Sequence, residues 1–148
     1  MVLVQHVLET ARGRLAVLSW DAPLCEAAAI LANPNTPLAV VCDTEGVVVG
    51  VISRGDVVRV LAAARVDALA LNAAAIMTSS VLSCRVSEPL QQVWDALKAR
   101  SLRCAPILDD EGRPQGIAHA RDVAGALLDE VAHEEVLLRD YVLGVGYQ

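Results

Sequence analysis

Two stretches of this chain, Gly50–Val57 with the sequence GVISRGDV and Gly116–Val123 with the sequence GIAHARDV, follow the same pattern, with Gly, Asp and Val at the same places. They lie 66 positions apart, and the same offset aligns the Asp-x-Glu-Gly turn at 43–46 with the one at 109–112. A chain that repeats one pattern in this way is built from copies of a single supersecondary unit. The repeat therefore predicts two similar halves, and function is best sought where the halves face each other.

Each copy has the same predicted order of elements, β-α-β-β-α. The elements of the first copy are an extended piece at 15–18, a helix from Asp21–Pro23 to Asn33 with Asp21 as its cap, a hairpin of 38–42 and 47–52, and a helix at 57–64. Those of the second copy are an extended piece at 81–83, a helix at 87–100, a hairpin of 104–108 and 116–119, and a helix from Arg121. A short amphipathic helix at 2–12, a connector at 66–75 and an amphipathic tail helix at 129–143 complete the chain.

Composition and charge narrow the class of protein. The chain has 148 residues, 55% of them hydrophobic, and a net charge of −6. This acidic balance argues against a nucleic-acid partner, because phosphate binding needs clustered Lys and Arg. The start has no signal-peptide pattern, and no apolar run is long enough to span a bilayer, so we expect no membrane partner.

The cysteines point to a cytoplasmic setting. Their spacing contains no CxxC pair and no accompanying His at metal-ligand distance, so we expect buried, reduced thiols and no metal site. The four cysteines are Cys25, Cys42, Cys84 and Cys104.

The motif that ends the first hairpin has a direct chemical interpretation. Ser53 and Asp56 lie at the predicted start of a helix, next to N–H groups that lack intrahelical partners. A carboxylate there can accept both hydroxyls of a ribose, and the N–H groups together with Arg54 suit a phosphate. The alternative is structural: Ser53 and Asp56 only cap the helix. The recurrence of Asp at 122 does not decide between the two, because both helices need a cap.

Over nearly its whole length the chain resembles the CBS-domain pair, or Bateman module. The residues that carry the resemblance are Gly50–Arg59, Ile76-Met77-Thr78, and Ala105–Asp109 with Gly112. The two ends are similar to those of small stand-alone bacterial CBS-pair proteins. The resemblance implies an α+β fold in which tandem β-α-β-β-α CBS repeats pack by their sheets as a pseudo-two-fold pair. It places the first CBS unit at 14–65, the second at 76–128, and flanking helices at 1–13 and 129–148.

The resemblance also implies clefts between the units that bind adenosyl ligands such as AMP, ADP, ATP, NAD or S-adenosylmethionine, and it implies homodimers. Carried over residue by residue, the candidate ligand-binding positions are Thr36, Pro37, Leu38, Ser53, Arg54, Asp56, Arg103, His119, Arg121 and Asp122. Within this set, Ser53 and Asp56 match the hydroxyl and the ribose-binding Asp, Thr36–Leu38 flank the base, and Arg103 matches a phosphate contact.

The second unit departs from the family pattern at one position. It retains Asp122, but His119 replaces the hydroxyl residue. This histidine fills the base pocket, binds phosphate as a cation, or blocks the site. We therefore expect the first unit's site to be the competent one.

Two classes of function follow. The first is a non-enzymatic regulatory sensor that binds an adenosyl nucleotide as its ligand and has no resident cofactor. The alternative is a ligand-free interaction scaffold that regulates an unknown protein through its helical faces, such as the tail at 129–143. An enzyme is not expected, since no activated nucleophile, metal cluster or paired carboxylates converge in the motifs.

Overall fold

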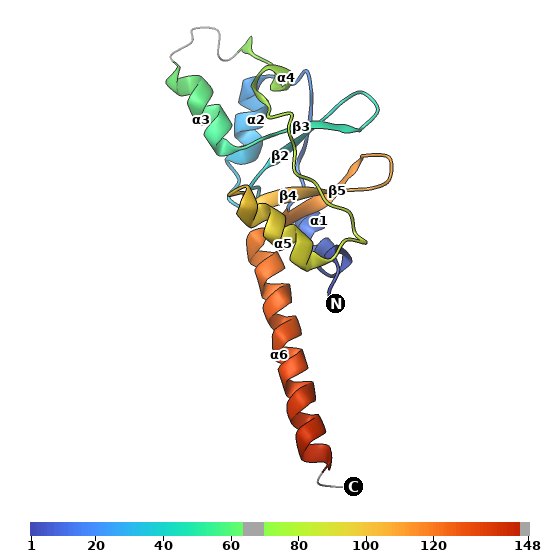
Figure 1. The fold of residues 1–148 in the computed structure, drawn as a ribbon. Coiled ribbons are helices and arrows are strands. Elements are labelled where there is room, and N and C mark those ends of the chain that lie inside the picture. The colour runs from blue at the N-terminus through green and yellow to red at the C-terminus, as the bar shows by residue number, and fades with distance from the viewer. Residues whose placement is uncertain (64–69, 146–148) are drawn as a thin grey trace.

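The computed structural model describes residues 1–63 and 70–145, and its fold is of the predicted α+β class (Figure 1). Its elements are, in order, η1 (Val4–Val7), α1 (Leu8–Gly13), β1 (Val17–Ser19), α2 (Leu24–Leu31), β2 (Ala39–Cys42), β3 (Val48–Ile52), α3 (Arg54–Ala62), α4 (Ala73–Ile76), α5 (Leu90–Ala99), β4 (Cys104–Leu108), β5 (Pro114–His119) and α6 (Ala120–Val145).

The first half is a three-stranded sheet with two helices against it. Strand β2 pairs in parallel with β1 and antiparallel with β3, which confirms the predicted hairpin. All four residues of β2 are buried, because Ala39 and Val41 pack with apolar side chains of α2 and α3, and Val40 and Cys42 pack in a second core on the other side of the sheet. The α2 helix begins after Pro23, and Asp21 instead accepts a hydrogen bond of 2.6 Å from the Ser19 hydroxyl. The prediction that Asp21 caps this helix is wrong.

The second half repeats this plan with fewer strands. Strands β4 and β5 form the predicted antiparallel hairpin, and α5 and α6 pack beside it. The predicted strand at 81–83 is absent from the described structure, where this part of the chain makes only one parallel bridge, between Cys84 and Ile107. Residues 66–69 of the predicted connector at 66–75 lie outside the described residues, as does residue 64, the predicted end of the helix at 57–64, and the rest of the connector overlaps α4.

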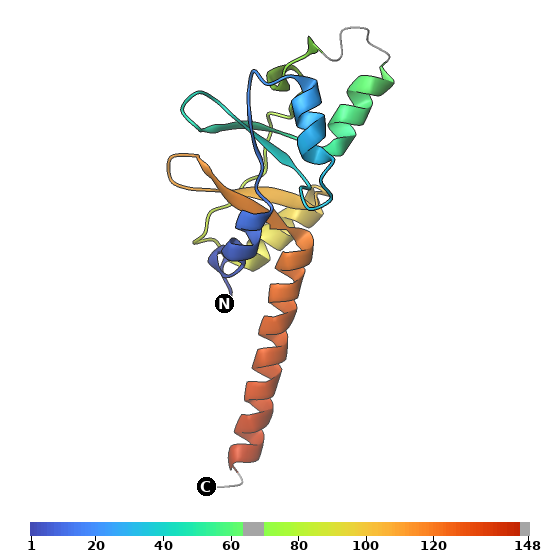
Figure 2. The same ribbon diagram turned by 180° about the vertical axis from the view of Figure 1, so that it is seen from behind.

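The two hairpins lie side by side (Figures 1 and 2). Their turns touch: the Val48 amide donates to the Gly112 carbonyl at 3.0 Å, and the Arg113 guanidinium donates to the Glu45 carbonyl at 3.3 Å. Apolar residues from both hairpins form a shared core, which consists of Leu38, Val40, Cys42 and Ile117. The two units therefore pack through their sheets.

The N-terminal segment crosses from one half to the other. Helix α1 packs on β5, and the Val4 amide donates to the Glu88 carbonyl at 2.9 Å, so the first residues complete the core of the second half. Only after α1 does the chain enter β1 of the first half. Gly116 makes this packing possible, because a Cβ atom there would lie 2.8 Å from the backbone of Ala11.

The last helix is longer than expected. Helix α6 runs from Ala120 to Val145 without a break, and both views show its second part extending away from the body (Figures 1 and 2). The predicted tail helix at 129–143 is thus the continuation of the helix predicted from Arg121. In the described part of the chain no helix is both long and apolar enough to cross a bilayer.

We expect Gly116→Ala to destabilise the protein by about 1–3 kcal/mol, because its new Cβ atom would force α1 away from β5. The matched control is Gly125→Ala in α6, where no atom beyond the chain neighbours and the nearby backbone of the helix itself lies within 4 Å of the new Cβ atom. Since alanine favours a helix interior over glycine by about 0.8–1.0 kcal/mol, this control should be neutral or stabilising. Urea unfolding of both variants measures the difference. Equal stability of Gly116→Ala and the wild type would contradict the close packing of α1.

Candidate functional site

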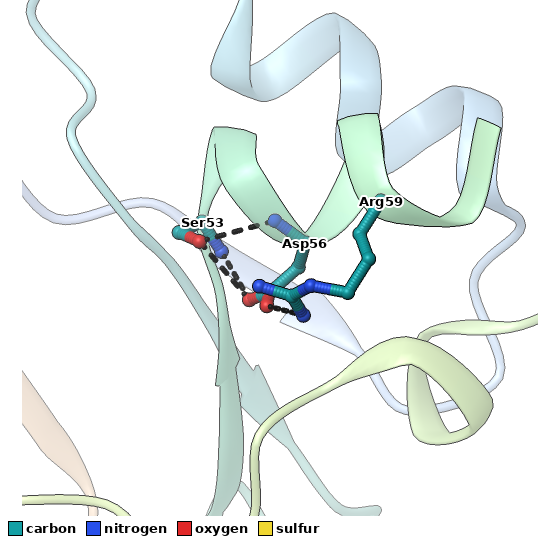
Figure 3. Close-up of polar contacts among 3 residues, drawn as sticks. All are labelled: Ser53, Asp56 and Arg59. Carbon is teal, nitrogen blue, oxygen red and sulfur yellow. Dashed lines mark hydrogen bonds and ion pairs between the residues drawn. The ribbon is translucent and has the colours of Figure 1, made fainter. Parts of the chain in front are cut away.

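The loop between β3 and α3 is organised by Ser53 and Asp56 (Figure 3). The Ser53 hydroxyl oxygen accepts from the Asp56 amide at 3.3 Å, and Asp56 Oδ2 accepts from the Ser53 amide at 2.9 Å and from its hydroxyl at 3.1 Å. These reciprocal bonds form a capping box, in which the side chains at both ends of the first turn satisfy backbone donors. The structural alternative considered for this motif is therefore confirmed as its local role.

The Asp56 carboxylate can accept more hydrogen bonds than the cap uses. Its other oxygen, Oδ1, accepts from Arg59 at 3.0 Å, and the residue is only 6% exposed. An ionised carboxylate has about four lone-pair sites, so three donors leave capacity for one more. A ligand hydroxyl that displaced the Ser53 hydroxyl would gain access to a second site. Asp56 is thus a buried, pre-oriented acceptor at the start of α3.

Arg54 uses most of its donors within the protein. Its Nε donates to the Leu31 carbonyl at 2.8 Å, and its Nη2 donates to the carbonyls of Asn33 and Thr36 at 2.9 and 3.0 Å. Leu31 is the last residue of α2, where a cation also compensates the helix dipole. Arg54 therefore holds the segment that enters the first hairpin in place.

The second unit arranges the equivalent positions differently. Arg14, just after α1, donates from Nε to Asp122 Oδ2 at 2.8 Å and from Nη2 to Asp122 Oδ1 at 3.2 Å. The side chains of this bidentate pair are 22% and 18% exposed. His119 takes the place of Ser53 as a cap, since its Nδ1 accepts from the Arg121 amide at 3.0 Å.

The cap requires a neutral imidazole, and the surroundings favour that form. Burial lowers the pKa of His119 from its usual 6.5, and Arg14, Arg121 and Arg103 lower it further, while the Asp122 carboxylate opposes them. Of the three alternatives for His119, binding phosphate as a cation is therefore disfavoured in the unliganded protein. The histidine remains on the cavity wall as a neutral side chain.

A cavity of about 690 Å³ lies between the two units. Of the residues proposed from the sequence, those that line it are Pro37, Leu38, Ser53, Arg54, Asp56, Arg103, His119 and Arg121. Thr36 and Asp122 are not among the lining residues: the Thr36 carbonyl binds Arg54, and Asp122 binds Arg14. The volume of the cavity falls within the range of about 300–1,000 Å³ that is typical of small-molecule sites.

The wall of this cavity is basic although the chain is acidic. Its charged residues are Arg14, Arg54, Arg100, Arg103, Arg121 and Asp56, whereas the net charge of the whole protein is −6. Concentrating guanidinium groups in one concave site attracts anions and binds phosphate or carboxylate oxygens well. The cavity is therefore suited to an anionic ligand.

Sequence reasoning missed two of these arginines, Arg14 and Arg100. Arg100 lies 66 positions after Pro34, in the segment that enters the second hairpin as Pro34 lies in the one that enters the first, so extending the repeat to this segment would have pointed to it. Arg14 has no such signal, because its counterpart at the same offset is Ser80 and neither residue belongs to a motif.

The cysteines are less uniformly buried than expected. Cys42 and Cys84 are buried, but Cys25 is exposed on α2, so the expectation fails there. Burial, with Glu88 nearby, raises the pKa of Cys84 to about 12. Burial also raises the pKa of Cys104, which lines the cavity, although Arg14 and Arg103 oppose this. Among the residues that the structure describes, no group of His, Cys, Asp and Glu is placed to hold a metal ion.

The chain is thus built from two related α+β units with a cavity between them. Residues 21–63 and 73–129 match the model of the CBS domain, and the chain therefore belongs to the CBS domain family. It is 28% identical over 127 residues to the "Uncharacterized 17.7 kDa protein in bps2 3'region" of Acidianus ambivalens, a match that covers 86% of this chain and 76% of that protein.

Two solved structures show the same fold. One is the CBS domain pair of protein MJ0100 in complex with 5'-methylthioadenosine and S-adenosyl-L-methionine, with a TM-score of 0.72, 23% identity, and coverage of 88% of this chain and 98% of that chain. The other is CBSX2 in complex with AMP, with a TM-score of 0.74, 23% identity, and coverage of 87% and 98%. The resemblance to a CBS-domain pair is confirmed, while the stand-alone bacterial type stays a prediction.

We expect His119 to titrate below pH 6.5, with Arg14→Gln raising its pKa and Asp122→Asn lowering it further, because the first removes a nearby cation and the second a nearby anion. Proton NMR of the imidazole across a pH series measures the three values. Because the unfolded state binds this proton more tightly, His119 also makes the protein less stable as the pH falls below about 6.5. Shifts of the same sign in both variants would contradict the assigned surroundings.

Proposed function

We propose that this protein is a non-enzymatic regulatory module that binds an adenosyl ligand in the cavity between its two CBS units. The observation that carries the proposal is the cavity itself, where the buried Asp56 acceptor and a basic wall face each other. Structures with the same fold hold 5'-methylthioadenosine, S-adenosyl-L-methionine or AMP. In this arrangement Ser53 and Asp56 receive the ribose, and Pro37 and Leu38 contact the base, with the Thr36 backbone held by Arg54.

Charge favours a phosphorylated ligand. The lining holds arginines and one carboxylate, and the arginines of the second unit that the sequence proposed, Arg103 and Arg121, suit phosphate oxygens. S-adenosylmethionine carries a positive sulfonium group, which this wall would repel. We therefore propose an adenine nucleotide, with affinity that increases with the number of phosphates.

Regulation would act through the relative position of the two units. The cavity wall comes from both, and the hairpins that carry it touch at their turns. A ligand that contacts both walls shifts the population toward the arrangement that it binds more tightly, by no more than the difference between its two affinities. The proposal includes a homodimer in the cytoplasm and an unidentified protein that responds to the change.

One observation favours a second candidate, the ligand-free interaction scaffold. The outer part of α6 exposes apolar side chains that are each more than half accessible, namely Leu128, Val131, Leu137, Leu138, Tyr141, Val142 and Leu143. Contiguous exposed apolar surface marks interaction sites. Dimerisation would cover the same side chains, so this surface is compatible with both functions.

Thermal denaturation against AMP, ADP, ATP, NAD and S-adenosylmethionine tests the proposal. A ligand that binds only the folded state, at 100 times its Kd, adds about 2.7 kcal/mol of stability and raises Tm by several degrees. We expect the largest rise with ATP or ADP and none with S-adenosylmethionine. No rise with any of these ligands, in protein shown to carry none, would favour the scaffold.

We expect Asp56→Ala to weaken nucleotide binding at least about tenfold, because hydrogen bonds to a charged group contribute about 1.5–3 kcal/mol and 1.4 kcal/mol is a factor of ten. Titration calorimetry measures the affinity at a temperature where both proteins are folded. Since Asp56 also caps α3, Asn72→Ala serves as a control that removes the side-chain cap of another helix, α4, at a residue outside the cavity lining. Unchanged affinity in Asp56→Ala would show that the ribose does not bind there.

A further inference from the structure

The two walls of the cavity are related by the repeat but differ in charge. Three lining or adjacent positions of the first unit are uncharged, and each becomes arginine in the second unit at an offset of 66 residues. The pairs are Pro34 and Arg100, Pro37 and Arg103, and Gly55 and Arg121. The cationic groups that line the cavity are therefore concentrated on its second-unit side. Arg14 also lies on this side, since it is bonded to Asp122 of the second unit.

These arginines also differ from Arg54 in how many of their N–H donors are already hydrogen-bonded within the protein. Within the described part of the chain, the guanidinium groups of Arg103 and Arg121 have no hydrogen-bond or ion-pair partner, and Arg100 makes one long bond of 3.4 Å to the Ser80 carbonyl. Arg54, on the first-unit side, is bonded to carbonyl oxygens at 2.8–3.0 Å. The guanidinium groups that are largely free to bind a phosphate thus lie on the second-unit side.

The two carboxylates of the repeat are just as unequal. Asp56 lines the cavity, and its Oδ2 accepts from a serine hydroxyl that a ligand hydroxyl can replace. Asp122 is outside the lining, and both its oxygens accept from Arg14 in a half-buried bidentate pair. Placing a ribose on Asp122 would break a charge-assisted pair, whereas placing it on Asp56 exchanges one hydroxyl for another.

We propose that the cavity binds one nucleotide per chain in a single orientation, with its ribose on Asp56 and its phosphates toward the second unit. Arg14 determines this orientation by occupying Asp122. The inference rests on the proposed nucleotide-binding function. It adds the number of bound ligands, their orientation in the cavity, and a role for Arg14, which the repeat motif alone does not assign. Arg14 is held in place because α1 is packed on β5 of the second unit.

Titration calorimetry with ADP and with adenosine tests this proposal. We expect one molecule of either ligand per chain. Asp56→Asn and Asp122→Asn form a matched pair, since both keep the shape of the side chain and remove its charge. The first should weaken adenosine binding about tenfold or more, and the second should change it by less than about twofold.

Arg14→Gln tests the second half of the proposal. This variant removes a cation and leaves Asp122 as an uncompensated anion beside the phosphates, so ADP binding should weaken by about tenfold or more and adenosine binding by much less. Adding Asp122→Asn to Arg14→Gln should restore part of the ADP affinity, because the uncompensated anion is then gone.

Two outcomes would overturn the orientation while leaving the proposed function intact. One is a stoichiometry of two ligands per chain, and the other is a loss of adenosine affinity in Asp122→Asn equal to that in Asp56→Asn. Absence of binding of either ligand to the wild-type protein would instead overturn the proposed nucleotide-binding function, and the inference with it.

Discussion

The packing of α1 on β5 is the contact on which the rest of the arrangement depends. It requires a residue without a side chain at Gly116, where Ala11 comes so close that a Cβ atom would lie 2.8 Å away. This contact joins the start of the chain to the second unit before β1 builds the first. As a result, the segment between α1 and β1 connects the second unit to the first. Arg14 lies in this segment, outside both hairpins, and reaches the cavity from there.

Asp56 shows how a side chain that caps a helix can also line a cavity. Its carboxylate caps α3, binds Arg59 and lines the cavity, and it is nearly inaccessible to water. Binding a ligand group to such a carboxylate requires little further free energy for desolvation or orientation, because folding has already removed most of its water and fixed its position. The capping box therefore holds the carboxylate in place, and a hydroxyl that approaches from the cavity could take the position of the Ser53 hydroxyl on it.

The repeat has diverged mainly in its charges. Both copies keep the hairpin, the cap at the start of the following helix and the Asp, so the backbone plan of the halves is alike. What differs is the side chain that caps, Ser53 against His119, and the distribution of arginines around the cavity. A symmetrical fold thus encloses an electrostatically asymmetrical site, which is the property that can give a ligand a direction.

The sequence by itself determined the local features, because they depend on neighbours in the chain. Apolar, β-rich runs on both sides of the 43–46 and 109–112 turns specify the hairpins, Ser53 and Asp56 specify the cap, and the 66-residue offset specifies two units. Only the tertiary structure decided the partner of Asp122, since Arg14 is 108 positions away and no pattern links the two. It also decided that α1 completes the second unit and that 81–83 forms no strand, because both depend on packing between distant segments rather than on local preference.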